Sequence, residues 1–129
     1  MAIPVPITLL YGGLTALLVT LLGANVSRLR LLLKAGPRDL PPELVRPVRA
    51  HGNSAEWAAL GLLLLLVLEL SRAAGSTVLH LFGGLFFLGR AFHAYGIYGR
   101  SALHMVGAVI NYLVLLAMSA WAIWFHFVR

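Results

Sequence analysis

The sequence contains no cysteine and very few charged residues. Of its 129 residues, ten are Lys or Arg and four are Asp or Glu, so that charged side chains make up 11%. Soluble domains carry about 25% charged residues, whereas apolar residues here reach 60%. So few charges cannot cover a water-exposed surface, which excludes a soluble globular enzyme and a disordered chain. The absence of cysteine excludes disulfides, thiolate metal sites and a cysteine nucleophile.

The sequence also lacks the alternating pattern of β-strands and consists mainly of long apolar runs. Crossing the hydrocarbon layer takes about 20 mostly apolar residues per helix. Four stretches of that length are separated by short segments rich in Gly, Pro and Ser: residues 6–33, 43–73, 77–98 and 102–128. Because lipid admits only helices or closed barrels as spanning structures, we predict an all-α integral membrane four-helix bundle, a single domain over residues 1–129.

The net charge of +6 is concentrated near the first connection between these helices. Nine of the charged residues lie between Arg28 and Glu56, whereas the second connection has Arg72 and the third has Arg100. By the positive-inside rule, we expect the first and third connections in the cytoplasm and both termini on the opposite side. The charges are few and lie among apolar runs, which does not suit nucleic acid, so no nucleic-acid partner is expected.

A polar stripe marks the first half of the second predicted helix. At about 100° per residue, its members fall within an arc of roughly 80°; they are Arg46, Arg49, Asn53 and Glu56. Charged groups at membrane depth are costly and usually pair with each other or with a polar ligand. A zwitterionic ligand with a carboxylate and an ammonium group fits the stripe, and an ion-pair network between helices is the structural alternative.

A second polar cluster ends the third predicted helix. Arg90, His93 and Arg100 share one face if the helix continues that far, with Tyr98 to the side. Intramembrane Arg and His are functional candidates by default, whereas Tyr98 is equally typical of the interfacial aromatic belt. His104 stands one turn beyond Arg100 and joins the candidates.

Other polar or small residues have structural interpretations. Arg28 ends the first helix on the same side and can equally extend to lipid phosphates. We expect Glu69 to pair with Arg72, three residues later. Small residues at every fourth position of the first helix allow a neighbouring helix to approach closely: Gly12, Ala16, Thr20 and Ala24. The remaining histidines share no close spacing with a carboxylate, so no metal site is expected.

These motifs resemble the MAPEG family, the membrane-associated proteins in eicosanoid and glutathione metabolism, along essentially the whole chain. They are Arg46-x-x-Arg49-Ala50-His51-x-Asn53-x-x-Glu56, Arg90-Ala-Phe-His93-Ala-Tyr95-Gly, and Arg100-Ser101. The short connections are similar to those of bacterial members. The resemblance implies a homotrimer in a bacterial inner membrane, with glutathione as co-substrate held between neighbouring subunits toward the cytoplasm.

The resemblance also implies roles for individual residues. Arg49, Asn53 and Glu56 hold the polar ends of glutathione, and Arg100 stabilises its thiolate, with Arg90 as the other candidate for that role. The rest of the predicted glutathione-binding set is Arg28 from a neighbouring subunit, His93, Tyr98, Ser101 and His104. A guanidinium near sulfur favours the reactive thiolate, which suits a chain without cysteine of its own.

Three departures from the family pattern bear on these roles. Gly52 stands where several members have Arg, the third connection is shorter, and His104 replaces a tyrosine of the eicosanoid-forming members. The implied function is a glutathione-dependent transferase or peroxidase acting on a lipophilic electrophile or hydroperoxide dissolved in membrane lipid. A non-catalytic lipid-binding protein of the same fold is the alternative. A small transporter is disfavoured because the polar groups crowd one end of the bundle.

Overall fold

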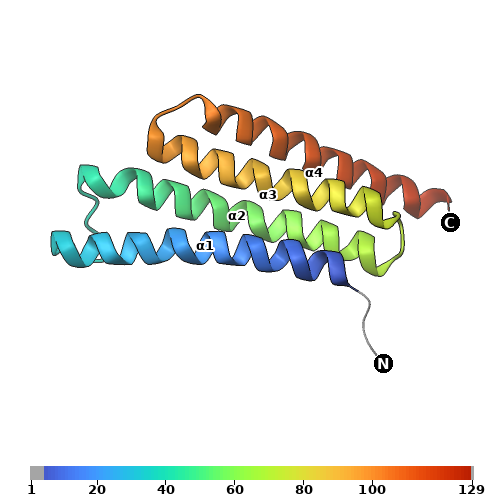
Figure 1. Cartoon of the computed structure of the whole chain (residues 1–129), viewed down its shortest axis with the longest axis horizontal. Helices are drawn as coiled ribbons and strands as arrows, with labels where there is room; N and C mark the ends of the chain where they lie inside the picture. Colours follow the sequence, from blue (N-terminus) through green and yellow to red (C-terminus); the bar gives the residue numbers. More distant parts are fainter. Residues whose placement is uncertain (1–4, 129) are drawn as a thin grey trace.

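The computed structural model describes residues 5–128 and folds them into four α-helices (Figure 1). The helices are α1 (Pro6–Leu33), α2 (Pro42–Leu70), α3 (Ser76–Gly99) and α4 (Leu103–Val128). Within residues 5–128 there is no β-strand. The predicted all-α, four-helix architecture is therefore confirmed, and each helix begins and ends within three residues of its predicted bounds.

The helix boundaries follow from prolines and from left-handed residues. Pro6 and Pro42 occupy the first turns of α1 and α2, where the missing N–H of proline costs no hydrogen bond. Arg72 and Arg100 have φ of 53°, in the left-handed region, which α-helical backbone does not adopt. The left-handed Arg72 explains why α2 ends at Leu70, three residues before its predicted end.

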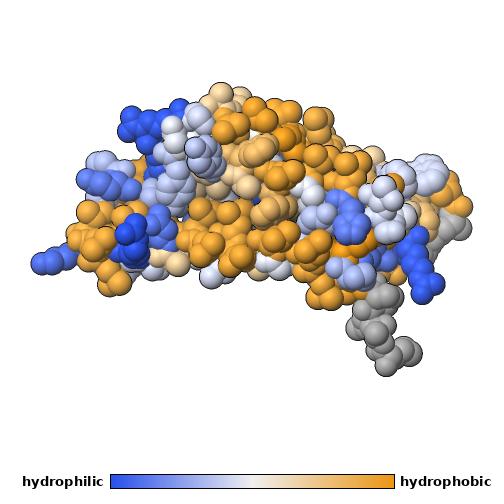
Figure 2. All heavy atoms as spheres, in the orientation of Figure 1, coloured by the Kyte–Doolittle hydropathy of each residue, from blue (hydrophilic) through white to orange (hydrophobic). Residues whose placement is uncertain are grey.

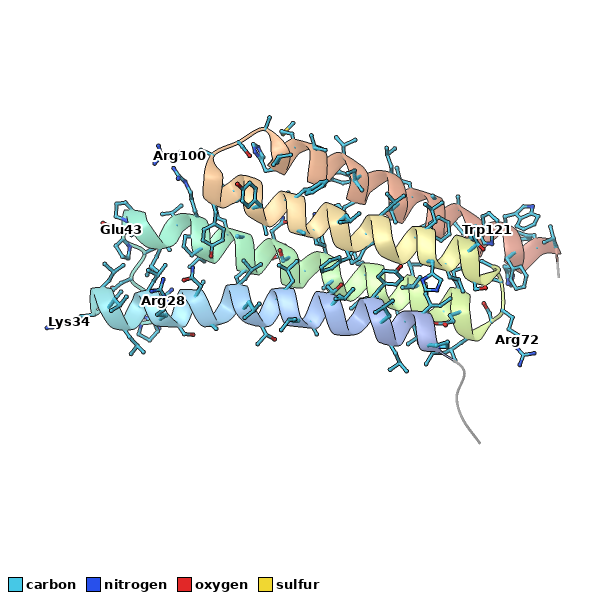
Figure 3. All side chains as sticks on the ribbon, in the orientation of Figure 1. Arg28, Lys34, Glu43, Arg72, Arg100 and Trp121 are labelled. Atoms are coloured by element: carbon cyan, nitrogen blue, oxygen red, sulfur yellow. The ribbon has the colours of Figure 1, made fainter. Side chains whose placement is uncertain are left out.

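The two ends of the bundle differ in charge. The α1–α2 and α3–α4 connections lie at one end, while the start of α1, the α2–α3 connection and the end of α4 lie at the other (Figure 1). We call the first of these the basic end, because it gathers Arg28, Arg30, Lys34, Arg38, Arg46, Arg49 and Arg100. Arg72 and Trp121 mark the far end (Figure 3). The first and third connections thus share one end, as the charge pattern predicts.

Three of the helices, α1, α2 and α4, are long and apolar enough to cross a membrane. The remaining helix, α3, has 24 residues but carries His80, Arg90 and His93 among its apolar residues. Four apolar spans were predicted, and three helices within residues 5–128 meet this description. Figure 2 shows hydrophobic residues along the middle of the visible face and the most hydrophilic residues near its ends. This is the surface expected of a protein that sits in a bilayer.

The interior changes character along the bundle. An apolar core fills the half toward the far end: Ile7, Leu65, Leu68, Ala73, Leu79, Phe82, Phe86, Val114 and Met118. In the half toward the basic end, α3 and α4 approach so closely that a Cβ on Gly96 or Gly107 would collide with the backbone of the other helix. The buried side chains there include Arg90 and Asn111. The basic half is therefore built around polar groups.

The small-residue stripe of α1 makes no such close contact within the chain. Ala16, Thr20 and Ala24 are exposed, and a Cβ built on Gly12 meets nothing within 4 Å. The stripe therefore remains open to lipid or to another subunit.

Glu69 does not serve the ion pair that its spacing predicts. Its carboxylate accepts hydrogen bonds from the backbone N–H groups of Ile7 (2.9 Å) and Thr8 (2.7 Å), in the first turn of α1. Free N–H groups at a helix N-terminus favour a negative charge. In place of the predicted pair with Arg72, which lies on the exposed α2–α3 connection, Glu69 caps α1 and ties it to α2.

Candidate functional site

Two cavities open at the basic end. The larger has a volume of about 510 Å³ and is lined by Asn25, Arg28, Leu29, Pro42, Glu43, Arg46, Pro47, Tyr98 and Arg100. The smaller, of about 310 Å³, is lined by Arg46, Arg49, Gly96, Ile97, Arg100 and His104. Because Arg46 and Arg100 line both, the cavities adjoin. Their volumes fall in the range of small-molecule sites, about 300–1,000 Å³.

The wall contributed by α1 is held to α3 through hydrogen bonds. Arg28 donates from Nη2 to Oδ1 of Asn25 (3.0 Å), and Asn25 donates from Nδ2 to the hydroxyl oxygen of Tyr98 (2.9 Å). The Tyr98 hydroxyl accepts this bond, so its own proton remains available to a ligand. Asn25 thus fixes one arginine and one tyrosine at the mouth of the larger cavity.

The opposite wall comes from α2 and from the short α3–α4 connection. Arg46 and Arg49 lie three residues apart on α2, which places them on neighbouring turns of one helix face. Arg100 follows the end of α3 in the left-handed conformation, and its side chain extends at the basic end (Figure 3). His104, in the first turn of α4, has Nδ1 2.7 Å from the carbonyl oxygen of Ser101.

The charges of the two cavities favour an anion. Four arginines line them: Arg28, Arg46, Arg49 and Arg100. Among the described lining residues, Glu43 is the one acidic side chain. Guanidinium groups bind carboxylates through paired, charge-assisted hydrogen bonds. Across residues 5–128, no group of three His, Asp or Glu side chains could hold a metal ion.

Arg90 and Asn53, both predicted to hold glutathione, contact each other. Arg90 is 1% exposed, and its Nη1 donates to Oδ1 of Asn53 at 2.8 Å. The guanidinium also lies over the Trp57 ring, 5.0 Å from its centroid, a cation–π arrangement. Arg90 lines neither cavity at the basic end, so in this chain it connects α3 to α2 inside the bundle.

The remaining predicted residues line neither of the two cavities. His93 and Ser101 are half-buried, and neither His93 Nδ1 nor Ser101 Oγ has a hydrogen-bond partner within residues 5–128. Glu56 is exposed and lines a separate cavity of about 290 Å³ with Trp57, Leu60 and Leu115. The four residues of the α2 stripe therefore lie in three different places: Arg46 and Arg49 in the cavities at the basic end, Asn53 against Arg90, and Glu56 in the separate cavity.

The structure therefore brings part of the predicted set together. The predicted residues that line the adjoining cavities are Arg28, Arg49, Tyr98, Arg100 and His104. Asn25, Glu43 and Arg46 also line the cavities but are not among the predicted site residues, although Arg46 belongs to the predicted polar stripe of α2. The spacing of Asn25 three residues before Arg28, on one helix face, is the signal that could have identified it.

Comparisons with known proteins agree with this architecture. The model of the MAPEG family matches residues 8–124. Inner membrane protein YecN of Escherichia coli (strain K12) is 32% identical over 95 residues, which cover 73% of this chain and 72% of that protein. The protein of the same name from Escherichia coli O6:H1 (strain CFT073) gives the same values.

Proposed function

The chain belongs to the MAPEG family, and from this premise we propose that it binds glutathione at the basic end and activates its thiol. The observation that carries the proposal is the pair of adjoining cavities that share Arg46 and Arg100. The activated thiol then attacks a lipophilic electrophile or hydroperoxide. The protein is, on this proposal, a membrane-embedded glutathione transferase or peroxidase.

The charges of glutathione match those of the cavities. The tripeptide carries two carboxylates and one ammonium group at neutral pH, so its two acidic ends need separate cationic partners. Arg28 and Arg49 belong to different cavities, with Arg46 common to both, which supports one carboxylate in each. Glu43 is the acidic group available to the ammonium within one chain.

Arg100 is the residue that we propose to stabilise the thiolate. It lines both cavities, whereas its competitor Arg90 is buried against Asn53 and Trp57. A thiol with the usual pKa of about 8.5 is only about 3% ionised at pH 7. A neighbouring guanidinium lowers that pKa by favouring the charged form. Because the thiolate is the nucleophile, a larger thiolate fraction raises the concentration of reactive glutathione in proportion.

Assembly and location complete the proposal. We propose a homotrimer in a bacterial inner membrane, with the basic end toward the cytoplasm, because basic connections are retained on that side. The exposed small residues Ala16, Thr20 and Ala24 allow a helix of another subunit to approach. Glu56, exposed on α2, gains a partner only when another subunit covers it, and its predicted role with the glutathione ammonium belongs to that assembly.

Turnover by the purified protein tests this function. We expect detergent-solubilised protein to conjugate glutathione to an aryl halide, or to reduce a lipid hydroperoxide, and Arg100→Ala to slow the reaction at least tenfold. Arg72→Ala is the matched control, since Arg72 has the same φ of 53° but lies at the far end (Figure 3). Glutathione binding without turnover of any electrophile would indicate the non-catalytic, lipid-binding alternative.

A further inference from the structure

One ring nitrogen of His104 has a fixed role in the structure. Its Nδ1 lies 2.7 Å from the carbonyl oxygen of Ser101. A carbonyl oxygen only accepts hydrogen bonds, so Nδ1 carries the proton and donates it. In the neutral ring, Nε2 is then the unprotonated nitrogen, with its lone pair free. Within residues 5–128 this is the single hydrogen bond that the His104 side chain makes.

The residues around His104 place its Nε2 lone pair beside a candidate ligand site. His104 lines the smaller cavity together with Arg46, Arg49 and Arg100, so a ligand held there meets a proton acceptor among guanidinium groups. Arginine cannot act as the acceptor, because it stays protonated in proteins. His93, on α3, is a second histidine of this region, and its backbone packs against Gly107 of α4. The titratable side chains Glu43 and Tyr98 line the adjoining cavity. Among the described residues that line the smaller cavity, His104 is the one whose side chain has a lone pair to accept a proton.

We propose that His104 is the general base that takes the proton of the bound thiol. This inference rests on the proposed glutathione function and adds a proton acceptor to it. The S–H bond breaks, its electron pair stays on sulfur, and the proton moves to Nε2 of His104. The new negative charge forms beside Arg100, and the imidazolium keeps its Nδ1–H bond to Ser101. The proton remains within the site, so thiolate forms without net release of a proton.

The number of protons released to buffer on binding distinguishes two cases: the thiol proton passes to His104 and stays in the site, or it passes to water. Glutathione is titrated calorimetrically in buffers with different ionisation enthalpies, which counts protons released, and the thiolate is measured by its ultraviolet absorbance. S-methylglutathione, which lacks the thiol proton, is the reference ligand. We expect thiolate at pH 7 in the wild-type complex, with the same proton count for both ligands.

The variant His104→Asn keeps an N–H donor for Ser101 but removes the base. We expect unchanged affinity for S-methylglutathione, which reports an intact fold and site. We also expect at least a fivefold loss of thiolate at pH 7 and a loss of conjugation rate of similar size, because the thiolate is the attacking species. Added imidazole should restore part of the rate. His80→Asn, on α3 at the far half of the bundle, is the matched control and should match the wild type.

The possible failures are distinguishable. If wild-type protein does not bind glutathione, the proposed function falls and this inference falls with it. If the wild type binds glutathione but releases one proton to buffer as the thiolate forms, His104 is not the acceptor, and the inference alone is overturned. The same holds if His104→Asn retains the thiolate at pH 7.

Discussion

The buried contact between Asn53 and Arg90 leads to the sharpest structural prediction. Asn53→Ala removes the oxygen to which Arg90 Nη1 donates at 2.8 Å. The second contact of Arg90 Nη1, with the backbone oxygen of Asn53, is 3.5 Å long, and Arg90 Nε has no hydrogen-bond partner within residues 5–128. The substitution therefore leaves a side chain that is 1% exposed without its one short hydrogen bond.

The cost follows from that burial. A hydrogen bond to a charged group contributes about 1.5–3 kcal/mol, and leaving its partner buried and unsatisfied costs the upper part of that range or more. Stacking on Trp57 at 5.0 Å remains and offsets part of the loss. We expect Asn53→Ala to lower the free energy of unfolding by about 2–3 kcal/mol, measured by reversible denaturation in mixed detergent micelles and followed by circular dichroism.

A double-mutant cycle makes this prediction specific to the pair. Arg90→Met fills the same space without a charge, so in its presence Asn53→Ala should cost less than about 1 kcal/mol, because apolar replacements of buried polar groups are often neutral. Asn25→Ala is the control, because the hydrogen bonds of Asn25 are part-buried (to Tyr98) and exposed (to Arg28); it should cost about 0.5–1 kcal/mol. Equal losses for Asn53→Ala and Asn25→Ala, with no coupling to Arg90, would refute the reasoning.

Three further substitutions test other parts of the structure. Gly96→Ala should lower the free energy of unfolding by about 1–3 kcal/mol, because the new Cβ would collide with the α4 backbone at His104. Gly52→Ala is the control and should leave the free energy of unfolding unchanged, because a Cβ there meets nothing within 4 Å. Glu69→Gln should cost about 1 kcal/mol by removing the negative charge from the N-terminus of α1, and an unchanged unfolding midpoint would contradict the capping role. Tyr98→Phe removes the hydroxyl bonded to Asn25 and should weaken glutathione binding about three- to tenfold, with a stability loss of no more than about 1 kcal/mol. An equal affinity would place the ligand elsewhere.

The sequence predicts the helices well because each depends on its own residues. Length and hydropathy define the apolar runs, and Gly36, Pro41 and Pro42 interrupt them where the first connection lies. The clustering of charge also predicts which end of the bundle is polar, since connections one and three must share an end when all four helices cross the same layer. These properties need no knowledge of how the helices pack.

The details of the site depend on how the helices are rotated against each other, which a single sequence does not reveal. Asn53 and Arg90 are 37 residues apart, and periodicity shows that each belongs to a polar face without showing that the faces meet. The predicted face shared by Arg90 and Arg100 is not formed, because α3 ends at Gly99. Glu69 reaches the first turn of α1, 62 residues away from Ile7, a contact that local spacing cannot suggest.

The hydrogen bond of His104 is also a contact that the sequence alone does not reveal. Ser101 lies three residues earlier, a spacing visible in the sequence, but the bond forms only because the chain turns at Arg100 between α3 and α4. That turn brings a base and an arginine to one cavity from different sides of a short connection. The shorter connection, which appeared in the sequence as a departure from the family, thus helps to build the proposed site.

The most direct test of the central claim is calorimetric titration of glutathione into the purified, detergent-solubilised protein. Glutathione bound between guanidinium groups should give saturable heat. Arg100→Ala should weaken the affinity about tenfold, which corresponds to about 1.4 kcal/mol. This is near the lower end for a hydrogen bond to a charged group, because the cavity is open to solvent. Arg72→Ala should bind as the wild type does. An absence of saturable binding in the wild type, or equal losses in the two variants, would contradict a glutathione site at the basic end.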